Sequence, residues 1–477
     1  MSQFIGLDVG TQGTKGIVID LARGEAVARA SRSYGLIQGL ADGAAEQDPQ
    51  TWWDAVVAVV REMVSDPAVD APRIAGLGVS GQQHGFVPLD GSGQVIRPAK
   101  LWCDTSTAAE AEELGVPAGF TASKILWLKR HEPTSFARLA QVMLPHDWLN
   151  QRLTSGAWME AGDASGTGFF DPRRRTFDLD RMAAIDARLH EWLPPLVAPD
   201  QIAGEISTEA AEALHLPTGL PVSPGGGDNM MSAIGSGAVR SGVCTLSLGT
   251  SGTVFSFAPD PVADESAAIA PFCDSTGGWL PLLCVMNATG VVEEVRGANG
   301  DLSALTEAAG SIAAGSDGLL FLPYLSGERV PDLPRATGTL LGMRPGALDP
   351  PRLFRAALEG TSLSLGWGVD RMRALSIEPG TVRVVGGGAR NELWCRILAS
   401  VMNVRIERLV EAESAALGAA LQAAWCVDGS GAREKLEALS APFLRIEGDP
   451  IEPVAADVET YAALSQRFRA EVGRIYD

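Results

Sequence analysis

A short pattern of glycine and threonine occurs twice in the chain, and this repeat limits the folds that the chain can adopt. Residues 4–19 read FIGLDVGTQGTKGIVI, and residues 243–257 read VCTLSLGTSGTVFSF. In both copies a Gly-Thr-x-Gly-Thr turn separates two apolar runs, which predicts a β-hairpin. The copies begin about half the chain apart and indicate two related domains, which we expect to span residues 1–240 and 241–477.

Strand-like and helix-like segments alternate in the rest of the chain, an order typical of an α/β fold. Asp48-Pro49 predicts the start of a helix, because aspartate caps helix ends and proline fits the first helical position. Residues 74–80 read as a strand that leads into a glycine-containing turn. Residues 382–385 read as another strand, followed by three glycines and a helix with one apolar face, an arrangement suited to nucleotide binding.

The first glycine-threonine turn has the residues of a phosphate-binding site. Glycines such as Gly13 let the backbone approach phosphate oxygens, and Thr11 and Thr14 add hydroxyl donors. Asp8 ends the preceding strand, and a carboxylate beside phosphates requires a cation between them, usually Mg²⁺. Two tight turns with an incidental aspartate are the alternative. We favour phosphate binding, because tight turns need glycine but not the repeated threonines.

The second turn differs from the first in one respect. Gly249 and Thr250 repeat the glycine and threonine of the first turn, whereas Ser247 stands at the position of Asp8. The two hairpins are therefore not interchangeable.

The segment Gly-Gly-Gly-Asp-Asn at 225–229 places Asp228 where a strand end meets a short helix. An aspartate at such a junction can face a cleft and accept the proton of an attacking hydroxyl in phosphoryl transfer. Aspartate is also a favoured helix cap. The residues around Asp228 leave the general base and the cap both open, although caps rarely need three preceding glycines.

The segment Ser-Gly-Gln-Gln-His-Gly at 80–85 follows a strand and contains Gln83 and His84. Amides and a histidine between glycines are suited to hydrogen-bonding the hydroxyls of a polyol. A solvated turn is the alternative, and composition alone favours it. The other four histidines are expected to be structural or exposed.

Composition and charge exclude several classes of protein. The net charge of −20 makes nucleic acid and anionic membranes poor partners. Six cysteines without a Cys-x-x-Cys pair argue against a disulfide framework and against a zinc or iron–sulfur site. Neither a signal peptide nor a membrane-spanning run is visible, so we expect a cytoplasmic protein.

Eight segments together resemble one known family. They are GLDVGTQGTK at 6–15, SGQQHG at 80–85, PHDWLNQRLTSG at 145–156, GDASGT at 162–167, GGGDN at 225–229, LSLGTSGT at 246–253, FLPYLSGER at 321–329 and GGGARNELW at 386–394. With these segments in this order, the whole chain resembles the FGGY carbohydrate kinases, and among them most the xylulokinases.

The resemblance implies two actin-like (ribonuclease H-like) ATPase domains, with ATP and a sugar bound in a central cleft between them. Because each domain has its own phosphate hairpin, we expect the domains to close on both ligands and exclude water. The resemblance also implies that Asp228 is the proton acceptor and that Asp8 is the carboxylate associated with metal and phosphates. The implied site residues are Thr11, Gly13, Gly249 and Thr250 for the phosphates, Gly387, Gly388 and Asn391 for adenosine, and Gln83, His84, Asp228 and Asn229 for the sugar.

The chain departs from typical xylulokinases at several positions. Gln83 replaces a methionine, Cys103 stands for an asparagine and Ser106 for an arginine, and the segment 114–121 is shorter. All these positions lie on or near the implied sugar side. They bear on which sugar is used and leave the kinase assignment unchanged.

We therefore predict an ATP- and Mg²⁺-dependent kinase that converts a ketopentose, D-xylulose, to its 5-phosphate. The alternatives are the same chemistry on ribulose, xylitol, glycerol or gluconate, and a non-metabolic ATPase switch of the actin and Hsp70 type. A chaperone would need a peptide-binding module after the ATPase, and little follows residue 430. The expected partners are the sugar and ATP, without nucleic acid or membrane, and a homodimer is the candidate assembly.

Overall fold

Both glycine-threonine turns join the two strands of an antiparallel hairpin, as the sequence predicts. β1 (Gln3–Val9) pairs with β2 (Gly13–Asp20), and β16 (Val243–Leu248) pairs with β17 (Gly252–Ser256). The computed structural model describes residues 2–297 and 300–476. The two hairpins belong to different compact units of the chain.

The two units are not simple halves of the sequence. Unit 1 contains Met1–Val239, Pro271–Leu280 and Glu413–Leu444, and unit 2 contains Arg240–Ala270, Pro281–Ala412 and Arg445–Asp477. The first division falls beside the expected boundary at 240/241, but two later segments belong to unit 1.

A seven-stranded sheet forms the centre of unit 1. In order across the sheet, its strands are β13 (Gly204–Glu205), β14 (Pro221–Val222), β5 (Ile74–Gly81), β1, β2 and β3 (Glu25–Ser33), and β15 (Gly226–Gly227) also pairs with β5. β1, β5 and β15 run parallel to one another, so their carboxyl ends lie at the same edge of the sheet.

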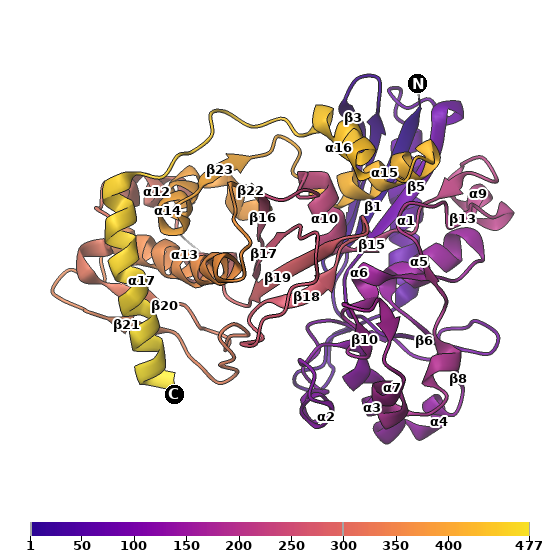
Figure 1. Cartoon of the computed structure of the whole chain (residues 1–477), viewed down its shortest axis with the longest axis horizontal. Helices are drawn as coiled ribbons and strands as arrows, with labels where there is room; N and C mark the ends of the chain where they lie inside the picture. Colours follow the sequence, from indigo (N-terminus) through magenta and orange to yellow (C-terminus); the bar gives the residue numbers. More distant parts are fainter. Residues whose placement is uncertain (1, 298–299, 477) are drawn as a thin grey trace. The chain divides into compact units, whose positions relative to one another are not determined.

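Helices cover both faces of this sheet. α1 (Pro49–Val64) packs on β2 and β3, and its cap is the predicted one, because Asp48 accepts a hydrogen bond from the backbone N–H of Gln50 at 2.9 Å. α15 (Ser414–Asp428) packs on β1 and β5, although it lies far from them in sequence (Figure 1). The approach is so close that a side chain on Gly6 of β1 would overlap the α15 backbone.

The second sheet contains the other hairpin. In order, its strands are β18 (Ala270–Cys273), β19 (Trp279–Val285), β17, β16, β22 (Thr381–Val385) and β23 (Arg405–Arg408). β22 runs parallel to β16, as β5 does to β1, so the two units repeat one arrangement around their hairpins.

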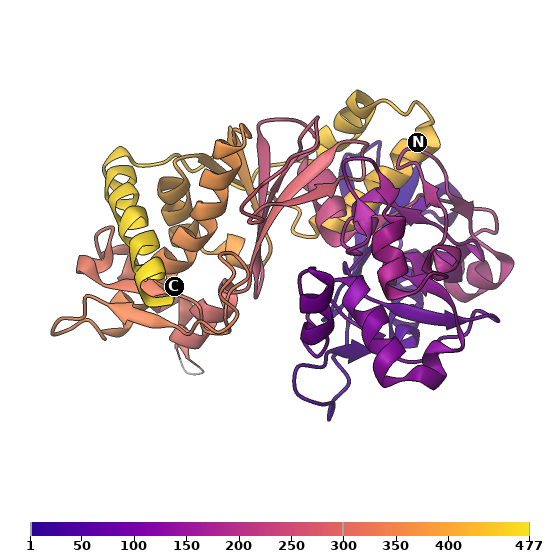
Figure 2. The same cartoon turned by 60° about the horizontal axis from the view of Figure 1, so that its bottom comes forward.

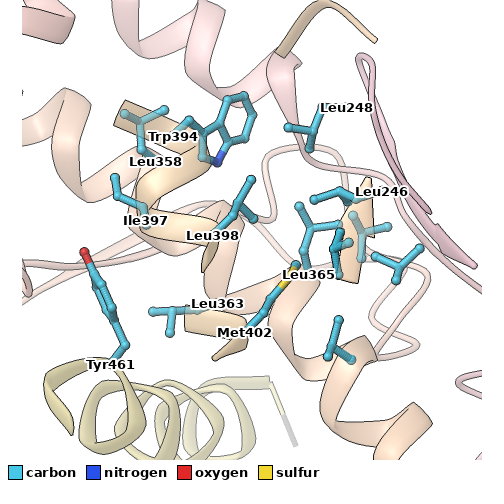
Figure 3. Close-up of a cluster of buried hydrophobic side chains, with 14 of the residues drawn as sticks. Leu246, Leu248, Leu358, Leu363, Leu365, Trp394, Ile397, Leu398, Met402 and Tyr461 are labelled. Carbon is cyan, nitrogen blue, oxygen red and sulfur yellow. The ribbon is translucent and has the colours of Figure 1, made fainter. Parts of the chain in front are cut away.

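Three long helices of unit 2 pack against one another (Figures 1 and 2): α13 (Pro350–Ala374), α14 (Glu392–Met402) and α17 (Ala455–Tyr476). Their apolar side chains meet those of β16 in the core of the unit (Figure 3). Leu246 of β16, Leu365 of α13 and Leu398 of α14 are fully buried there. This packing fixes the end of β16, where the second turn begins.

The remaining elements are short. The helices are α2 (Ala108–Leu114), α3 (Thr121–His131), α4 (Pro133–Phe136), α5 (Pro145–Thr154), α6 (Ala161–Ala164), α7 (Leu179–Ile185), α8 (Leu189–Trp192), α9 (Thr208–Leu214), α10 (Asp228–Ser236), α11 (Thr289–Arg296), α12 (Leu302–Gly310) and α16 (Arg433–Ser440). Among the residues that the structure describes, five strand pairs lie outside the two sheets: β4 (Glu46–Gln47) with β7 (Ala99–Lys100), β6 (Val87–Asp90) with β8 (Leu139–Met143), β9 (Met159–Glu160) with β12 (Leu196–Val197), β10 (Phe170–Asp171) with β11 (Thr176–Phe177), and β20 (Leu320–Leu322) with β21 (Thr339–Leu341). Across residues 2–297 and 300–476, every helix is too short or too polar to span a membrane.

Candidate functional site

Three parallel strands of unit 1 end in a single row of residues. Asp8 of β1 lies opposite Ser80 of β5, and Ser80 lies opposite Gly226 of β15. The Ser80 hydroxyl donates a hydrogen bond of 2.9 Å to Asp8 Oδ1. Asp228 follows Gly226 by two residues, so the fold brings the two predicted carboxylates to the same edge of the sheet.

Asp228 is the first residue of α10, and the cap of this helix is Gly227. The alternative role of Asp228 as a helix cap therefore does not apply. Its Oδ1 instead accepts hydrogen bonds from the backbone N–H of Asn229 at 2.8 Å and from Asn229 Nδ2 at 3.0 Å. These bonds hold the carboxylate in one orientation.

Burial makes both carboxylates more basic than usual. Desolvation, together with the negative charge of Asp8, raises the pKa of Asp228 to about 7. Desolvation also raises the pKa of Asp8 to about 6, although the hydrogen bond from Ser80 and the charge of Lys15 lower it. A carboxylate with a pKa near 7 is suited to accept a proton at neutral pH.

Gln83 is joined directly to the Asp228 segment. Its Oε1 accepts a hydrogen bond of 2.9 Å from Asn229 Nδ2, the same nitrogen that donates to Asp228. Gly227 packs against the Gln83 side chain, since a Cβ at position 227 would lie 2.5 Å from Gln83 Cγ. Gln83 is 4% exposed, and within the described part of the chain its Nε2 has no hydrogen-bond partner. The Gln83 side chain therefore supports Asn229, and through Asn229 the orientation of Asp228.

His84 is held in place on several sides, so the loop at 80–85 is not the solvated turn that composition favours. The ring packs on Phe120 and Phe272, with centroid distances of 4.7 Å and 5.8 Å. The backbone carbonyl of His84 accepts a hydrogen bond of 2.9 Å from Lys124 Nζ. Gly166 lies so close to the ring that any side chain there would overlap it. The segments at 162–167 and 225–229 thus pack directly on this loop, through Gly166 and Gly227.

Side chains that the sequence did not single out form hydrogen bonds with the threonines of the first turn. The Thr11 hydroxyl donates to Gln82 Oε1 and accepts from Trp102 Nε1, both at 2.9 Å. Thr14 is fully buried, and its hydroxyl lies 3.2 Å from that of Tyr34. Trp102 belongs to the Leu-Trp-Cys-Asp stretch in which the chain departs from typical relatives. The threonines of this turn therefore shape the hairpin through their side chains.

The second turn lies at the start of α11, a helix that the sequence did not indicate. The Thr289 hydroxyl donates a hydrogen bond of 2.6 Å to the carbonyl of Gly249, and the N–H of Ala288 donates to the carbonyl of Thr250 at 3.1 Å. Gly249 and Thr250 are themselves exposed. The turn is therefore anchored by its carbonyls and open on its other side.

The glycine segment after β22 lies beside the second hairpin within unit 2. A Cβ on Gly388 would approach Leu248 Cβ, at the end of β16, to 2.7 Å, and Gly387 is exposed. Asn391 caps α14, and its Nδ2 donates to the hydroxyl of Thr306 at 3.2 Å. The residues expected for phosphate and for adenosine in unit 2 thus form one continuous region.

The carboxylates of unit 1 suit a magnesium ion better than an all-protein metal site. In the described part of the chain, histidine, cysteine and acidic side chains do not form a group of three or more that could hold a metal ion. Mg²⁺ is usually held by one or two carboxylates and by phosphate oxygens. The half-buried Asp8, which lies next to the first turn, fits that description.

Comparison with known proteins assigns both parts of the chain to one family. A model of the FGGY family of carbohydrate kinases, N-terminal domain, matches residues 3–235, and the model of its C-terminal domain matches residues 244–427. A xylulose kinase of Haemophilus influenzae is 36% identical over 99% of this chain and 100% of its own. The structure of a ligand-bound xylulose kinase from Lactobacillus acidophilus has a TM-score of 0.91 at 26% identity, covering 100% of this chain and 99% of that one. A gluconate kinase from the same organism has a TM-score of 0.90 at 26% identity, with the same coverage.

Proposed function

Because the chain belongs to the FGGY family of carbohydrate kinases, we propose that it transfers the γ-phosphoryl group of ATP to D-xylulose, giving ADP and D-xylulose 5-phosphate. The two-domain α/β fold of the actin-like type that the sequence predicts is the fold of this family. The observation that carries the choice of sugar is the near full-length similarity to the Haemophilus influenzae enzyme.

Asp228 is the general base of the proposed reaction. The attacking sugar hydroxyl transfers its proton to the carboxylate as its oxygen bonds to the γ-phosphorus, and the bond from that phosphorus to the bridging oxygen of ADP breaks. Asn229 holds the carboxylate through two hydrogen bonds, so that little reorientation is needed. The pKa of Asp228, raised to about 7 by desolvation and by Asp8, leaves it a stronger base than an exposed aspartate.

Each hairpin contributes its own candidate residues for nucleotide binding. Asp8 would hold Mg²⁺, which neutralises charge on the phosphates during transfer. We assign the β- and γ-phosphates to the backbone of the two turns and adenosine to the segment after β22, as the sequence predicts. The assigned residues are Thr11, Gly13, Gly249 and Thr250 for the phosphates and Gly387, Gly388 and Asn391 for adenosine.

The sugar is held by the loop at 80–85. We assign to His84 a hydrogen bond to a sugar hydroxyl, because its ring is fixed by two phenylalanines and Lys124 holds its carbonyl. Asn229 and Gln83 complete this set. The Gln83 amide is already bonded to Asn229, which suggests that it acts on the sugar largely by placing Asn229.

A related sugar or sugar acid is the second candidate, favoured by two observations. The fold is almost as similar to that of the gluconate kinase as to that of the xylulose kinase. Gln83 also stands where typical xylulokinases have methionine. Both candidates use the same phosphoryl transfer.

An ADP-release assay with a panel of ketopentoses, polyols and sugar acids tests the proposal. D-Xylulose should give the highest kcat/KM, and turnover without sugar should be small. A higher value for gluconate or another polyol would replace the proposed sugar, and strong turnover without any sugar would favour an ATPase switch. The homodimer and the cytoplasmic location stay predictions, which sedimentation analysis and cell fractionation would test.

A further inference from the structure

A cluster of buried ionisable side chains lies at the start of α5. His146 Nδ1 is 2.6 Å from Asp163 Oδ2, and His146 Nε2 is 3.2 Å from Asp147 Oδ1. All three side chains are fully buried. Asp147 also accepts a hydrogen bond of 2.9 Å from the backbone N–H of Leu144, which explains Asp147 as part of the helix cap. The His146–Asp163 pair has no such local explanation.

The His146 side chain touches the backbone of both segments that carry the proposed chemistry. A Cβ on Gly81 would approach His146 Cβ to 2.8 Å, and Gly81 lies in the loop at 80–85 with Gln83 and His84. A Cβ on Gly225 would approach His146 Cδ2 to 3.3 Å, and Gly225 begins the segment that ends in Asp228 and Asn229. His146 therefore packs against both segments, with its Cβ and backbone at Gly81 and with its imidazole ring at Gly225.

Asp163 connects the ion pair to the surface on which the His84 ring packs. It lies on α6, where Glu160 accepts hydrogen bonds from the backbone N–H groups of Gly162 and Asp163 at 2.8 Å and 2.6 Å. Three residues beyond Asp163, Gly166 lies directly against the His84 ring. A shift of Asp163 would therefore move the surface on which His84 rests.

The cluster needs a positive charge at its centre. Desolvation lowers the pKa of His146, but the carboxylates of Asp147, Asp163 and Glu160 outweigh it and raise that pKa to about 9. Desolvation raises the pKa of Asp147 and of Glu160 to about 7 each. The strands that His146 touches contribute glycines there, so its charged neighbours come from α5, from α6 and from the cap of α6. An unpaired buried charge would be strongly destabilising, so His146 and Asp163 depend on each other.

We propose that the buried His146–Asp163 ion pair is a positioning element for phosphoryl transfer, which holds the His84 loop and the Asp228 segment in register with each other. Neither residue touches the substrate. His146 acts through the backbone at Gly81 and Gly225, and Asp163 acts through His146 and through the segment that supports His84. The effect on turnover rests on the proposed role of Asp228 as general base.

The charge of Asp163 gives the pair a second effect that a purely structural role would lack. Two charged groups with large effects on Asp228 are Asp8 of β1 and Asp163 of α6, and both raise its pKa. Removing the charge of Asp163 should lower that pKa. The acidic limb of the pH profile of kcat/KM should then move to lower pH.

The first experiment examines the parent protein and does not depend on the sugar. The chain has only five histidines, so ¹⁵N-histidine labelling gives a simple spectrum, and loss of one signal in His146→Gln assigns His146. We expect the His146 ring to stay doubly protonated well above pH 7. Titration of that ring near the ordinary value of about 6.5 would overturn the proposal.

The second experiment measures the variants Asp163→Asn and His146→Gln with the sugar that the panel selects. We expect kcat to fall by about 10- to 100-fold, as for other residues that orient catalytic groups, with a raised KM for the sugar and an unchanged KM for ATP. Asp163→Asn should also shift the acidic limb to lower pH. The matched control is His131→Gln, which breaks a more exposed histidine–glutamate pair, with His131 Nε2 3.1 Å from Glu110 Oε1, and should change none of these values.

The proposal would be overturned if both variants had the kcat and the KM for the sugar of the parent, together with an unshifted acidic limb of the pH profile. A loss of activity that only follows the unfolded fraction in thermal melts would overturn it as well. If Asp163→Asn does not fold, His146→Gln, whose amide can still donate to Asp163, supplies the kinetics, and the titration of the parent decides. If Asp228 is not the general base, Asp228→Asn keeps its activity while the pKa of the His146 ring stays high. This outcome distinguishes a failure of the proposed function from a failure of the positioning role.

Discussion

Replacing Asp228 by asparagine separates its role as a base from every other role it has. The amide has nearly the same size and can still accept a hydrogen bond from the N–H of Asn229, but it cannot take up a proton at neutral pH. We expect kcat to fall by roughly 10²- to 10⁴-fold, the usual contribution of a positioned general base. KM for ATP should be unchanged, because Asp228 is not among the residues assigned to the nucleotide.

The same substitution should stabilise the fold at alkaline pH. The pKa of Asp228 is about 7 in the fold, against 3.8 for an ordinary aspartate, because burial and Asp8 disfavour its ionised form. The ionised carboxylate therefore costs stability, a cost that is absent below pH 3.8, grows as the pH rises to 7 and is complete above pH 7. At about 1.36 kcal/mol per pKa unit the cost is at most about 4 kcal/mol, and solvent contact of the half-buried side chain reduces it.

Thermal melts at pH 5 and pH 8, paired with initial rates of ADP release, measure both effects. Asp228→Asn should raise Tm more at pH 8 than at pH 5 while it abolishes most turnover. Asp20→Asn is the control with the opposite sign. Burial raises the pKa of Asp20, but hydrogen bonds from the N–H of Ala22 and from Gln3, with the charge of Arg73, outweigh it and lower the pKa, so the variant should lose stability and keep kcat. Parental turnover in Asp228→Asn, or a lower Tm at pH 8, would refute the reasoning.

Four further outcomes are expected. In the parent, kcat/KM should fall about tenfold per pH unit below pH 7, as Asp228 becomes protonated; a flat profile from pH 5 to 8 would contradict its pKa. Asp8→Ala should raise the Mg²⁺ concentration needed for half-maximal rate by at least about tenfold and leave nucleotide binding without metal nearly unchanged, measured by titration; overlapping curves would exclude Asp8 as the metal ligand. His84→Ala should lower kcat/KM for the sugar by about 1.5–4 kcal/mol with KM for ATP unchanged, and an equally active variant would place the sugar elsewhere. Gln83→Met, assayed against the sugar panel, should raise the preference for D-xylulose if Gln83 tunes the site for another polyol.

Local signals were sufficient for the elements whose ends are set by their own residues. The two hairpins follow from glycine and threonine at fixed spacing, and α1 follows from Asp48-Pro49. α11 has no such signal, because alanine is the residue at its cap and makes no side-chain cap hydrogen bond. Its first turn is instead bonded to the carbonyls of Gly249 and Thr250, which lie about 40 residues earlier. A helix held by such tertiary contacts cannot be recognised from its own sequence.

The site shows the same division between local and distant causes. The position of Asp228 between a strand and a helix was predictable, but the choice between base and cap depends on Gly227, whose backbone takes the cap position. His146 was expected to be structural or exposed. It is buried because its carboxylate partner Asp163 lies 17 residues further on, beyond the range of any local pattern.

The difference between the two hairpins explains how one arrangement can serve two tasks. In unit 1 the strand before the turn ends with Asp8 opposite the hydroxyl of Ser80, whereas in unit 2 the equivalent Ser247 lies opposite Val385. Backbone amides of a glycine turn can bind phosphate in either unit, but only unit 1 adds carboxylates whose pKa values are raised to about 6 and about 7. A metal ion and a proton acceptor both need such carboxylates, and a neutral adenosine does not. We therefore expect proton transfer and metal binding at the copy with Asp8, and a role in nucleotide binding alone for the copy with Ser247.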